Sequence, residues 1–143
     1  MILFVGQIDR SHRDREAFQE VDYRAMFGTV AKWVTEIDQT ERLPEYIARA
    51  FATAMNGRPG PVVLVLPEDM LTQPVKAVAL PRLEAIQAWS DPGALRTLRD
   101  MLLAARKPLV IAGGGGWTTQ SAQALQRFAE NWQLPVTNAF RFQ

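Results

Sequence analysis

Residues 57–66 read Gly-Arg-Pro-Gly-Pro-Val-Val-Leu-Val-Leu, a turn rich in glycine and proline that runs directly into an apolar stretch. Proline fixes its own backbone angle and glycine permits angles that other residues avoid, so residues 57–61 predict a stiff turn. Residues 62–66 are apolar at every position, which is typical of a strand buried on both faces of a parallel sheet. This stretch therefore predicts a central strand of an α/β domain.

An amphipathic helix is predicted immediately before this turn, over residues 43–55. Its apolar residues recur at spacings of three and four, which places them on one helical face. Thr40 is the predicted N-cap of this helix. Helix, turn and buried strand form half of a βαβ unit, and the short apolar runs at residues 2–5 and 30–37 predict further strands of the same sheet.

The same alternation of helix and strand begins again after residue 91. The second half is predicted to contain two helices, at 94–105 and 121–132, and two strands, at 109–112 and 134–137. Between the halves, residues 74–91 hold two prolines and show no helical or alternating pattern. We therefore expect parallel sheets covered by helices, in two incomplete α/β domains at residues 1–73 and 92–143 that are joined by a linker.

The composition excludes several classes of function. The 143 residues include 16 Lys plus Arg against 15 Asp plus Glu, a balance that argues against a dedicated nucleic-acid or anionic-membrane binder. With no cysteine and one histidine, the chain cannot supply a thiolate metal site, a cysteine nucleophile or a multi-histidine site. The apolar run at 62–66 is far shorter than the ~20 residues that cross a bilayer. We expect a cytoplasmic protein with neither a nucleic-acid nor a membrane partner.

Four consecutive glycines, Gly113 to Gly116, stand between a predicted strand and a predicted helix. Backbone N–H groups at such a place can hold a phosphate at a helix N-terminus. The dinucleotide-binding pattern is not met, because its third glycine would fall at Thr118 or Thr119. The residues alone leave two interpretations open, a tight turn between strand and helix or a phosphate contact.

Several short motifs occur together in one order. They are Gly6-Gln7, Phe18-Gln19-Glu20, Lys32-Trp33, the turn and strand at 57–66, and Pro67-Glu68-Asp69. In this combination the chain resembles the thiamine-diphosphate-dependent enzymes of the acetolactate synthase type. Residues 1–73 are similar to the second half of their N-terminal, pyrimidine-binding domain, and residues 92–143 to the start of their central domain.

The resemblance implies a carboligase or decarboxylase that acts on small 2-oxo acids as a homodimer or homotetramer. It implies thiamine diphosphate and Mg²⁺ as cofactors and, in part of the family, FAD. Phe18 and Gln19 match the family's pair beside the substrate channel, and Lys32 matches the lysine at the channel mouth. The flavin-contacting turn of the central domain is matched by Gly113, Gly114 and Gly115.

The family's activating glutamate and its magnesium motif have no counterpart in these residues. Glu20 lies in a different motif and is not assigned the activating role. We therefore assign no catalytic and no metal-binding residue here, and we expect this chain by itself to be inactive. The alternative is a non-catalytic α/β nucleotide-binding or interaction module that uses the glycine run.

Overall fold

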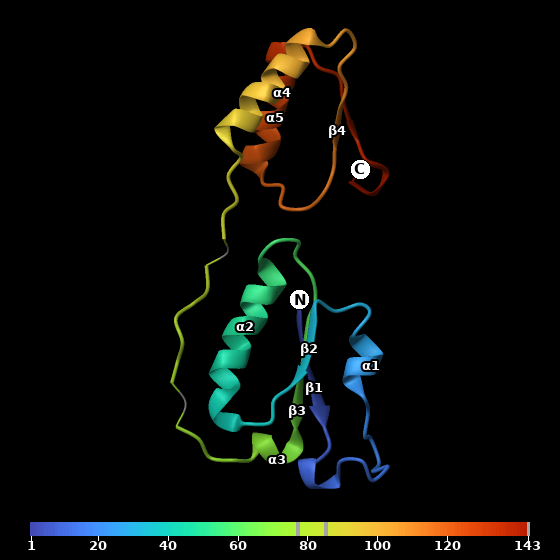
Figure 1. Cartoon of the computed structure of the whole chain (residues 1–143), viewed down its shortest axis with the longest axis vertical. Helices are drawn as coiled ribbons and strands as arrows, with labels where there is room; N and C mark the ends of the chain where they lie inside the picture. Colours follow the sequence, from blue (N-terminus) through green and yellow to red (C-terminus); the bar gives the residue numbers. More distant parts are fainter. Residues whose placement is uncertain (77, 85, 143) are drawn as a thin grey trace. The chain divides into compact units, whose positions relative to one another are not determined.

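The computed structural model describes residues 1–76, 78–84 and 86–142. The chain divides into two compact units, Met1–Ala88 and Trp89–Gln143, each with its own parallel sheet (Figure 1). The predicted linker at 74–91 has no helix or strand in its described residues before α4 (Pro92–Ala104) begins, and Ala77 and Ala85 lie outside the described residues. The expected α/β class with open parallel sheets is confirmed.

The first unit contains a three-stranded parallel sheet in the order β1-β3-β2. Its strands are β1 (Ile2–Gln7), β2 (Trp33–Glu36) and β3 (Val62–Pro67). Val62 at the start of the central strand is in register with both Ile2 and Trp33. The strand predicted at 30–37 is shorter than expected, because the N–H groups of Val30 and Ala31 bond back to the carbonyl of Phe27.

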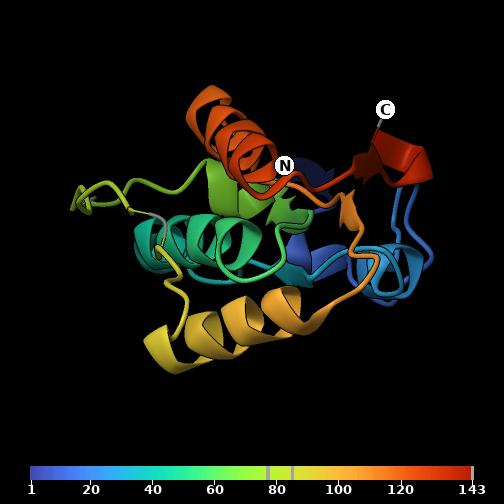
Figure 2. The same cartoon turned by 90° about the horizontal axis from the view of Figure 1, so that it is seen from above.

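Helices cover this sheet on both faces, as its apolar central strand predicts. Helix α2 (Leu43–Met55) lies on one face, and the short α1 (Tyr23–Phe27) lies on the other (Figures 1 and 2). The core between α2 and the sheet is formed by Ile37, Ala50, Ala54, Val62, Leu64 and Met70. Burying such side chains contributes roughly 1.5–3 kcal/mol for each large one, so this core stabilises the packing of α2 on the sheet.

The prediction that Thr40 caps α2 is wrong. Thr40 begins a 3-10 turn, η2 (Thr40–Arg42), and α2 starts only at Leu43 without a side-chain cap. The buried Thr40 hydroxyl donates instead to the carbonyl of Met70 at 3.1 Å. Met70 belongs to α3 (Glu68–Leu71), a short helix directly after β3 that the sequence pattern did not predict.

The second unit has two helices and two parallel strands, as predicted. Helices α4 (Pro92–Ala104) and α5 (Thr119–Trp132) accompany β4 (Val110–Ala112) and β5 (Val136–Asn138), and the turn η3 (Phe140–Phe142) follows. Its two-stranded sheet leaves much apolar surface open, with Ile111 65% exposed. None of the helices in the described residues of either unit is long and apolar enough to cross a membrane.

Candidate functional site

The carboxyl ends of β1 and β3 open onto a cavity of about 640 Å³, called here the carboxyl-edge cavity. In open α/β sheets, ligands collect at this end of the strands, because the loops that leave the strands converge there. The cavity is lined by Gly6, Gln7, Ile8, Asp9, His12, Ala17, Phe18, Gln19, Tyr23, Leu66, Glu68 and Leu71. Two of the site residues predicted from the sequence, Phe18 and Gln19, are therefore neighbours in one cavity wall.

Phe18 and Gln19 lie in the loop between β1 and α1, residues 8–22, called here the β1–α1 loop. The Phe18 side chain is 90% exposed and so takes no part in the core. Gln19 has a φ of 69°, in the left-handed region. This conformation costs a non-glycine residue about 1–2 kcal/mol, and such strain gathers at functional sites. The loop thus presents an exposed aromatic ring and, next to it, an exposed amide side chain on a strained backbone.

Hydrogen bonds from polar side chains hold the β1–α1 loop in this shape. The Glu20 carboxylate accepts from the backbone N–H groups of Asp14 (2.7 Å) and Ala17 (3.2 Å). These bonds, the one from Asp14 above all, lower the pKa of Glu20. At the end of β1, Gln7 Nε2 donates to the carbonyl of Val21 at 2.7 Å. Glu20 therefore shapes the loop that carries Phe18 and Gln19.

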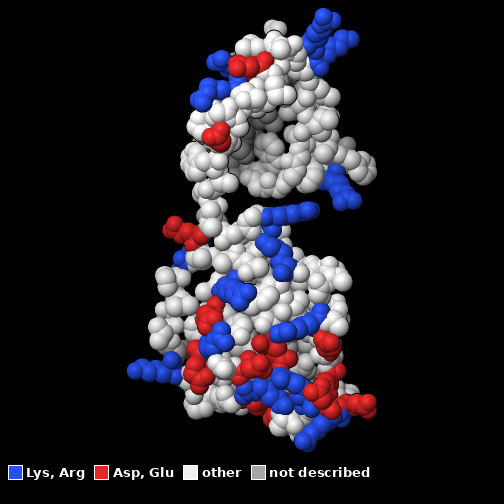
Figure 3. All heavy atoms as spheres, in the orientation of Figure 1, with Lys and Arg blue, Asp and Glu red and all other residues white. Residues whose placement is uncertain are grey.

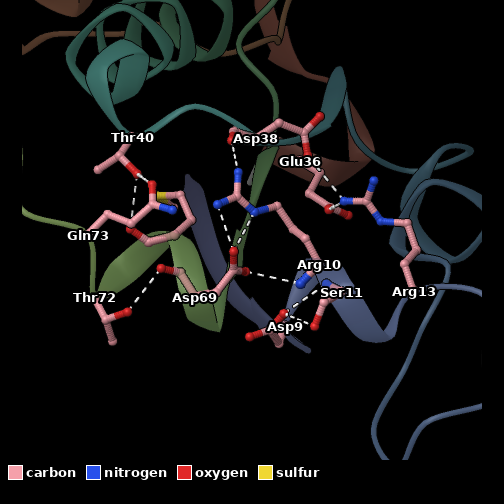
Figure 4. Close-up of polar contacts among 11 residues, drawn as sticks. Asp9, Arg10, Ser11, Arg13, Glu36, Asp38, Thr40, Asp69, Thr72 and Gln73 are labelled. Carbon is pink, nitrogen blue, oxygen red and sulfur yellow. Dashed lines mark hydrogen bonds and ion pairs between the residues drawn. The ribbon is translucent and has the colours of Figure 1, made fainter.

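Arg10 and Asp69 form an ion pair that joins the start of this loop to α3 (Figure 4). Asp69 Oδ2 accepts from Arg10 Nε at 2.7 Å, and Asp69 Oδ1 accepts from the Arg10 backbone N–H at 3.0 Å. Arg10 Nη1 also donates to the carbonyl of Asp38, which follows β2. The hydrogen bond from the Arg10 side chain is the main cause of the lowered pKa of the Asp69 carboxyl. One guanidinium thus connects the carboxyl ends of all three strands.

A second arginine of the loop, Arg13, contacts the carboxylates of Glu36 and Asp38. Acidic and basic side chains crowd together at this end of the first unit (Figure 3). Arg13 is 45% exposed and Asp38 60% exposed, and ion pairs this open to water contribute at most about 1 kcal/mol. The Arg10–Asp69 pair, with both side chains about three-quarters buried, is the stronger connection.

Lys32, the third predicted channel residue, lies at the opposite end of the sheet. Its backbone N–H donates to the carbonyl of Pro61, just before β3 begins, whereas the cavity lies where β3 ends. At ~3.3 Å per residue, the length of β3 separates the two places by about 16 Å. Lys32 Nζ donates at 2.9 Å to the carbonyls of Asn56 and Arg58, which follow α2. The structure thus brings Phe18 and Gln19 together but not Lys32.

The glycine run of the second unit forms the turn between β4 and α5. Gly114 and Gly116 have φ values of +82° and +83°, which side chains rarely adopt. A Cβ on Gly113 would lie 3.1 Å from Ala139 Cβ, whereas one on Gly115 would meet nothing within 4 Å. Gly113 is therefore packed against this chain, and Gly114 and Gly115 are open to an approaching group.

The N-terminus of α5 beside this turn is capped by its own side chains. Thr118 Oγ1 accepts from the N–H of Ser121 at 3.1 Å, and Ser121 Oγ accepts from the N–H of Thr118 at 2.8 Å. This capping box satisfies two of the donors that a phosphate would use. The geometry therefore favours the tight turn over the phosphate contact.

An apolar cavity of about 760 Å³ lies between this turn and α5, and the second unit is visibly hollowed in Figure 3. Trp117, Leu125, Leu134, Val136 and Phe142 are among the residues that line it. Its lining is mostly apolar because the two-stranded sheet leaves one side of α5 uncovered, with Gln126, Glu130, Gln133 and Asn138 as its polar members.

Comparison with known proteins identifies the relatives of this chain. The family described as "Thiamine pyrophosphate enzyme, central domain" matches residues 95–143. The acetolactate synthase large subunit of Lactococcus lactis subsp. lactis (strain IL1403) is 31% identical over 144 residues, which is 96% of this chain and 25% of that protein. The acetolactate synthase isozyme 3 large subunit of Escherichia coli (strain K12) is 33% identical over 142 residues, with coverages of 95% and 25%. This chain is a relative of the thiamine-diphosphate-dependent enzymes of the acetolactate synthase type.

The solved structures agree with this relationship. Benzoylformate decarboxylase from Polynucleobacter necessarius matches with a TM-score of 0.86 and 29% identity, over 96% of this chain and 26% of that one. The chain spans about a quarter of the length of the relatives it matches. These matches favour the thiamine-diphosphate enzyme over the alternative of a nucleotide-binding or interaction module, which rested on the glycine run alone.

The carboxyl-edge cavity fits only part of a thiamine diphosphate molecule. Gln7, Gln19 and Phe18 offer amide and aromatic groups to an uncharged ring. The carboxylates in the lining, Asp9 and Glu68, would repel a diphosphate. No group of three or more acidic, histidine or cysteine side chains suited to a metal ion occurs in the described part of the chain. These residues therefore do not hold the diphosphate or its metal.

The sequence pattern did not predict that Arg10 pairs with Asp69 of the Pro67-Glu68-Asp69 motif, although a signal for this pairing existed. Each follows a predicted strand by a few residues, and parallel strands bring their carboxyl ends to one edge of a sheet. Applied to 2–5 and 62–66, that rule places the charged residues after both strands side by side. The specific pairing depends on α3, which only the structure reveals.

Proposed function

We propose that this chain forms part of a thiamine-diphosphate-dependent carboligase or decarboxylase that acts on small 2-oxo acids. The observation that carries the proposal is the convergence of the Gly6-Gln7 strand end with Phe18 and Gln19 in one cavity, in a chain 31–33% identical to acetolactate synthases over nearly its whole length. In this proposal, Phe18 and Gln19 line the substrate channel. The same role for Lys32 remains a prediction from the sequence, and its hydrogen bonds to Asn56 and Arg58 support a structural role instead.

The proposal extends to domains and cofactors. Residues 1–73 would be the second half of a pyrimidine-binding domain, residues 74–91 a linker and residues 92–143 the start of a central domain. The complete enzyme would use thiamine diphosphate with Mg²⁺, work as a homodimer or homotetramer, and reside in the cytoplasm. If FAD binds, the open backbone of Gly114 and Gly115 is better suited to contact it than the packed Gly113.

The experiment that tests this proposal is an assay of the complete enzyme with pyruvate and related 2-oxo acids. We expect consumption of a 2-oxo acid with release of carbon dioxide, and this turnover should disappear when thiamine diphosphate and Mg²⁺ are removed. A complete protein that binds nucleotides through the turn at 113–116 but turns over no 2-oxo acid would contradict the proposal.

A further inference from the structure

Among the described residues, Arg10 alone forms hydrogen bonds to the segments that follow both β2 and β3 at the carboxyl edge of the sheet. Its backbone N–H and its guanidinium both bond to the Asp69 carboxylate, at 3.0 and 2.7 Å, and Nη1 donates to the Asp38 carbonyl. Arg10 follows β1, Asp38 follows β2 and Asp69 follows β3. The guanidinium therefore makes its hydrogen bonds within the chain and does not line the cavity. Any effect of Arg10 on a ligand must be indirect.

We infer that Arg10 is a positioning residue, which fixes the β1–α1 loop so that Phe18 and Gln19 face the ligand. This inference rests on the function proposed above. The loop contains Asp14, Glu16 and Gln19 in the left-handed region, with φ values of 60°, 54° and 69°. Three such residues in one short loop persist only where the surroundings determine the backbone.

The Arg10–Asp69 pair is the connection best able to fix this loop. Nε and Nη2 of Arg10 both lie 2.7 Å from Asp69 Oδ2, and Nη1 donates to the Asp38 carbonyl, a planar arrangement that the point charge of a lysine cannot reproduce. Asp69 also adjoins Glu68, which lines the cavity from the other side. This pair thus sets the start of the loop against α3.

The other polar contacts of the loop are local, more exposed, or confined to its far end, where Gln7 Nε2 donates to the carbonyl of Val21. Glu20 bonds only to N–H groups of the loop itself, and Arg13 is 45% exposed. Loss of the Arg10 pair would therefore loosen the start of the loop relative to the sheet and destabilise the hydrogen bonds that Glu20 accepts from the N–H groups of Asp14 and Ala17.

The first test is amide hydrogen exchange on the complete enzyme, which needs no activity. In Arg10→Lys, amides 13–20 should exchange at least about tenfold faster than in the wild type, because the loop opens locally. Amides of α2 should be unchanged. Arg42→Lys is the matched control, since Arg42 pairs with Glu45 on the surface at the start of α2, and it should leave amides 13–20 unaffected. Unchanged exchange at 13–20 in Arg10→Lys would overturn the inference.

The second test is a double-variant cycle on kcat/KM with Gln19→Ala. If Arg10 acts through the loop, Arg10→Lys should lower kcat/KM in both backgrounds, but the fold-decrease should be at least about five times smaller in Gln19→Ala than in the wild type. In the Lys32→Met background, its effect should be the same as in the wild type. If the fold-decrease in kcat/KM of the double variant equals the product of the two single-variant decreases, the positioning role is overturned. Absence of any thiamine-dependent turnover would instead refute the proposed function, and hydrogen exchange would then decide the inference alone.

Discussion

The two edges of the β1-β3-β2 sheet differ in how their polar side chains are used. At the amino edge, where the strands begin, the Lys32 ammonium group donates to the carbonyls of Asn56 and Arg58, and its side chain lies against Gly60. At the carboxyl edge, ion pairs hold a loop whose own exposed residues, Phe18 and Gln19, make no contribution to the core. At the amino edge the Lys32 ammonium group is bonded within the chain, whereas at the carboxyl edge the loop surrounds a cavity.

We interpret this difference as a separation of stability from function within one sheet. Connections at the amino edge run directly from helix to strand, so their polar groups are satisfied within the turn. The longer loop at the carboxyl edge is held by side chains such as Arg10 and Glu20, so that Phe18 and Gln19 remain free to contact a ligand. Variants at the amino edge should therefore change stability, and variants of Phe18 or Gln19 at the carboxyl edge should change activity.

The largest effect on stability is expected from Gly60→Ala at the amino edge. The added Cβ would lie 2.8 Å from Cγ and Cδ of Lys32, whose Nζ is anchored beyond them. Such overpacking costs about 1–3 kcal/mol, which urea unfolding of the complete protein would measure.

The matched control for Gly60→Ala is Gly6→Ala at the carboxyl edge of the same sheet. A Cβ on Gly6 would meet nothing within 4 Å, so the free energy of unfolding should change by less than about 0.5 kcal/mol. The new methyl group would nevertheless enter the carboxyl-edge cavity. Equal losses of stability in the two variants would break the distinction between the edges.

A smaller effect of opposite sign is expected from Gln19→Gly. Glycine adopts a φ of 69° without the strain of about 1–2 kcal/mol that a side chain incurs, although its greater freedom in the unfolded chain offsets part of this gain. The variant should be about 0.5–1 kcal/mol more stable in urea unfolding and should turn over substrate more slowly. A variant that is less stable would show that the Gln19 side chain serves the fold.

The sequence predicted the elements whose pattern reflects burial. Residues 43–55 form a helix with the predicted bounds, and the apolar run at 62–66 lies at the centre of the sheet. Thr40 was misassigned because its hydroxyl has a tertiary partner, the carbonyl of Met70, that no local pattern reveals. Burial periodicity is a local property of the chain, whereas the partner of a polar side chain depends on which strands become neighbours.

The candidate site was predictable to the extent that it follows from motifs. Phe18 and Gln19 share the cavity with the strand end at Gly6-Gln7, whereas the motif containing Lys32 lies at the other edge. Motif order carries no information on which end of a strand a residue occupies unless the strand direction is also used. The Arg10–Asp69 pair depends further on the short α3, whose few residues show no periodicity.

The measurement that tests the separation of the two edges most directly compares Gln19→Ala with Lys32→Met in the complete enzyme. Melting temperature and kcat/KM for its 2-oxo acid would be measured on the same preparations. Gln19→Ala should lower kcat/KM by at least about tenfold, the equivalent of one lost hydrogen bond to the ligand, with nearly unchanged melting. Lys32→Met should lower the melting temperature while the folded enzyme keeps its turnover. The reverse result, with a stable but slow Lys32 variant and an active but unstable Gln19 variant, would contradict the assignment of function to the carboxyl edge.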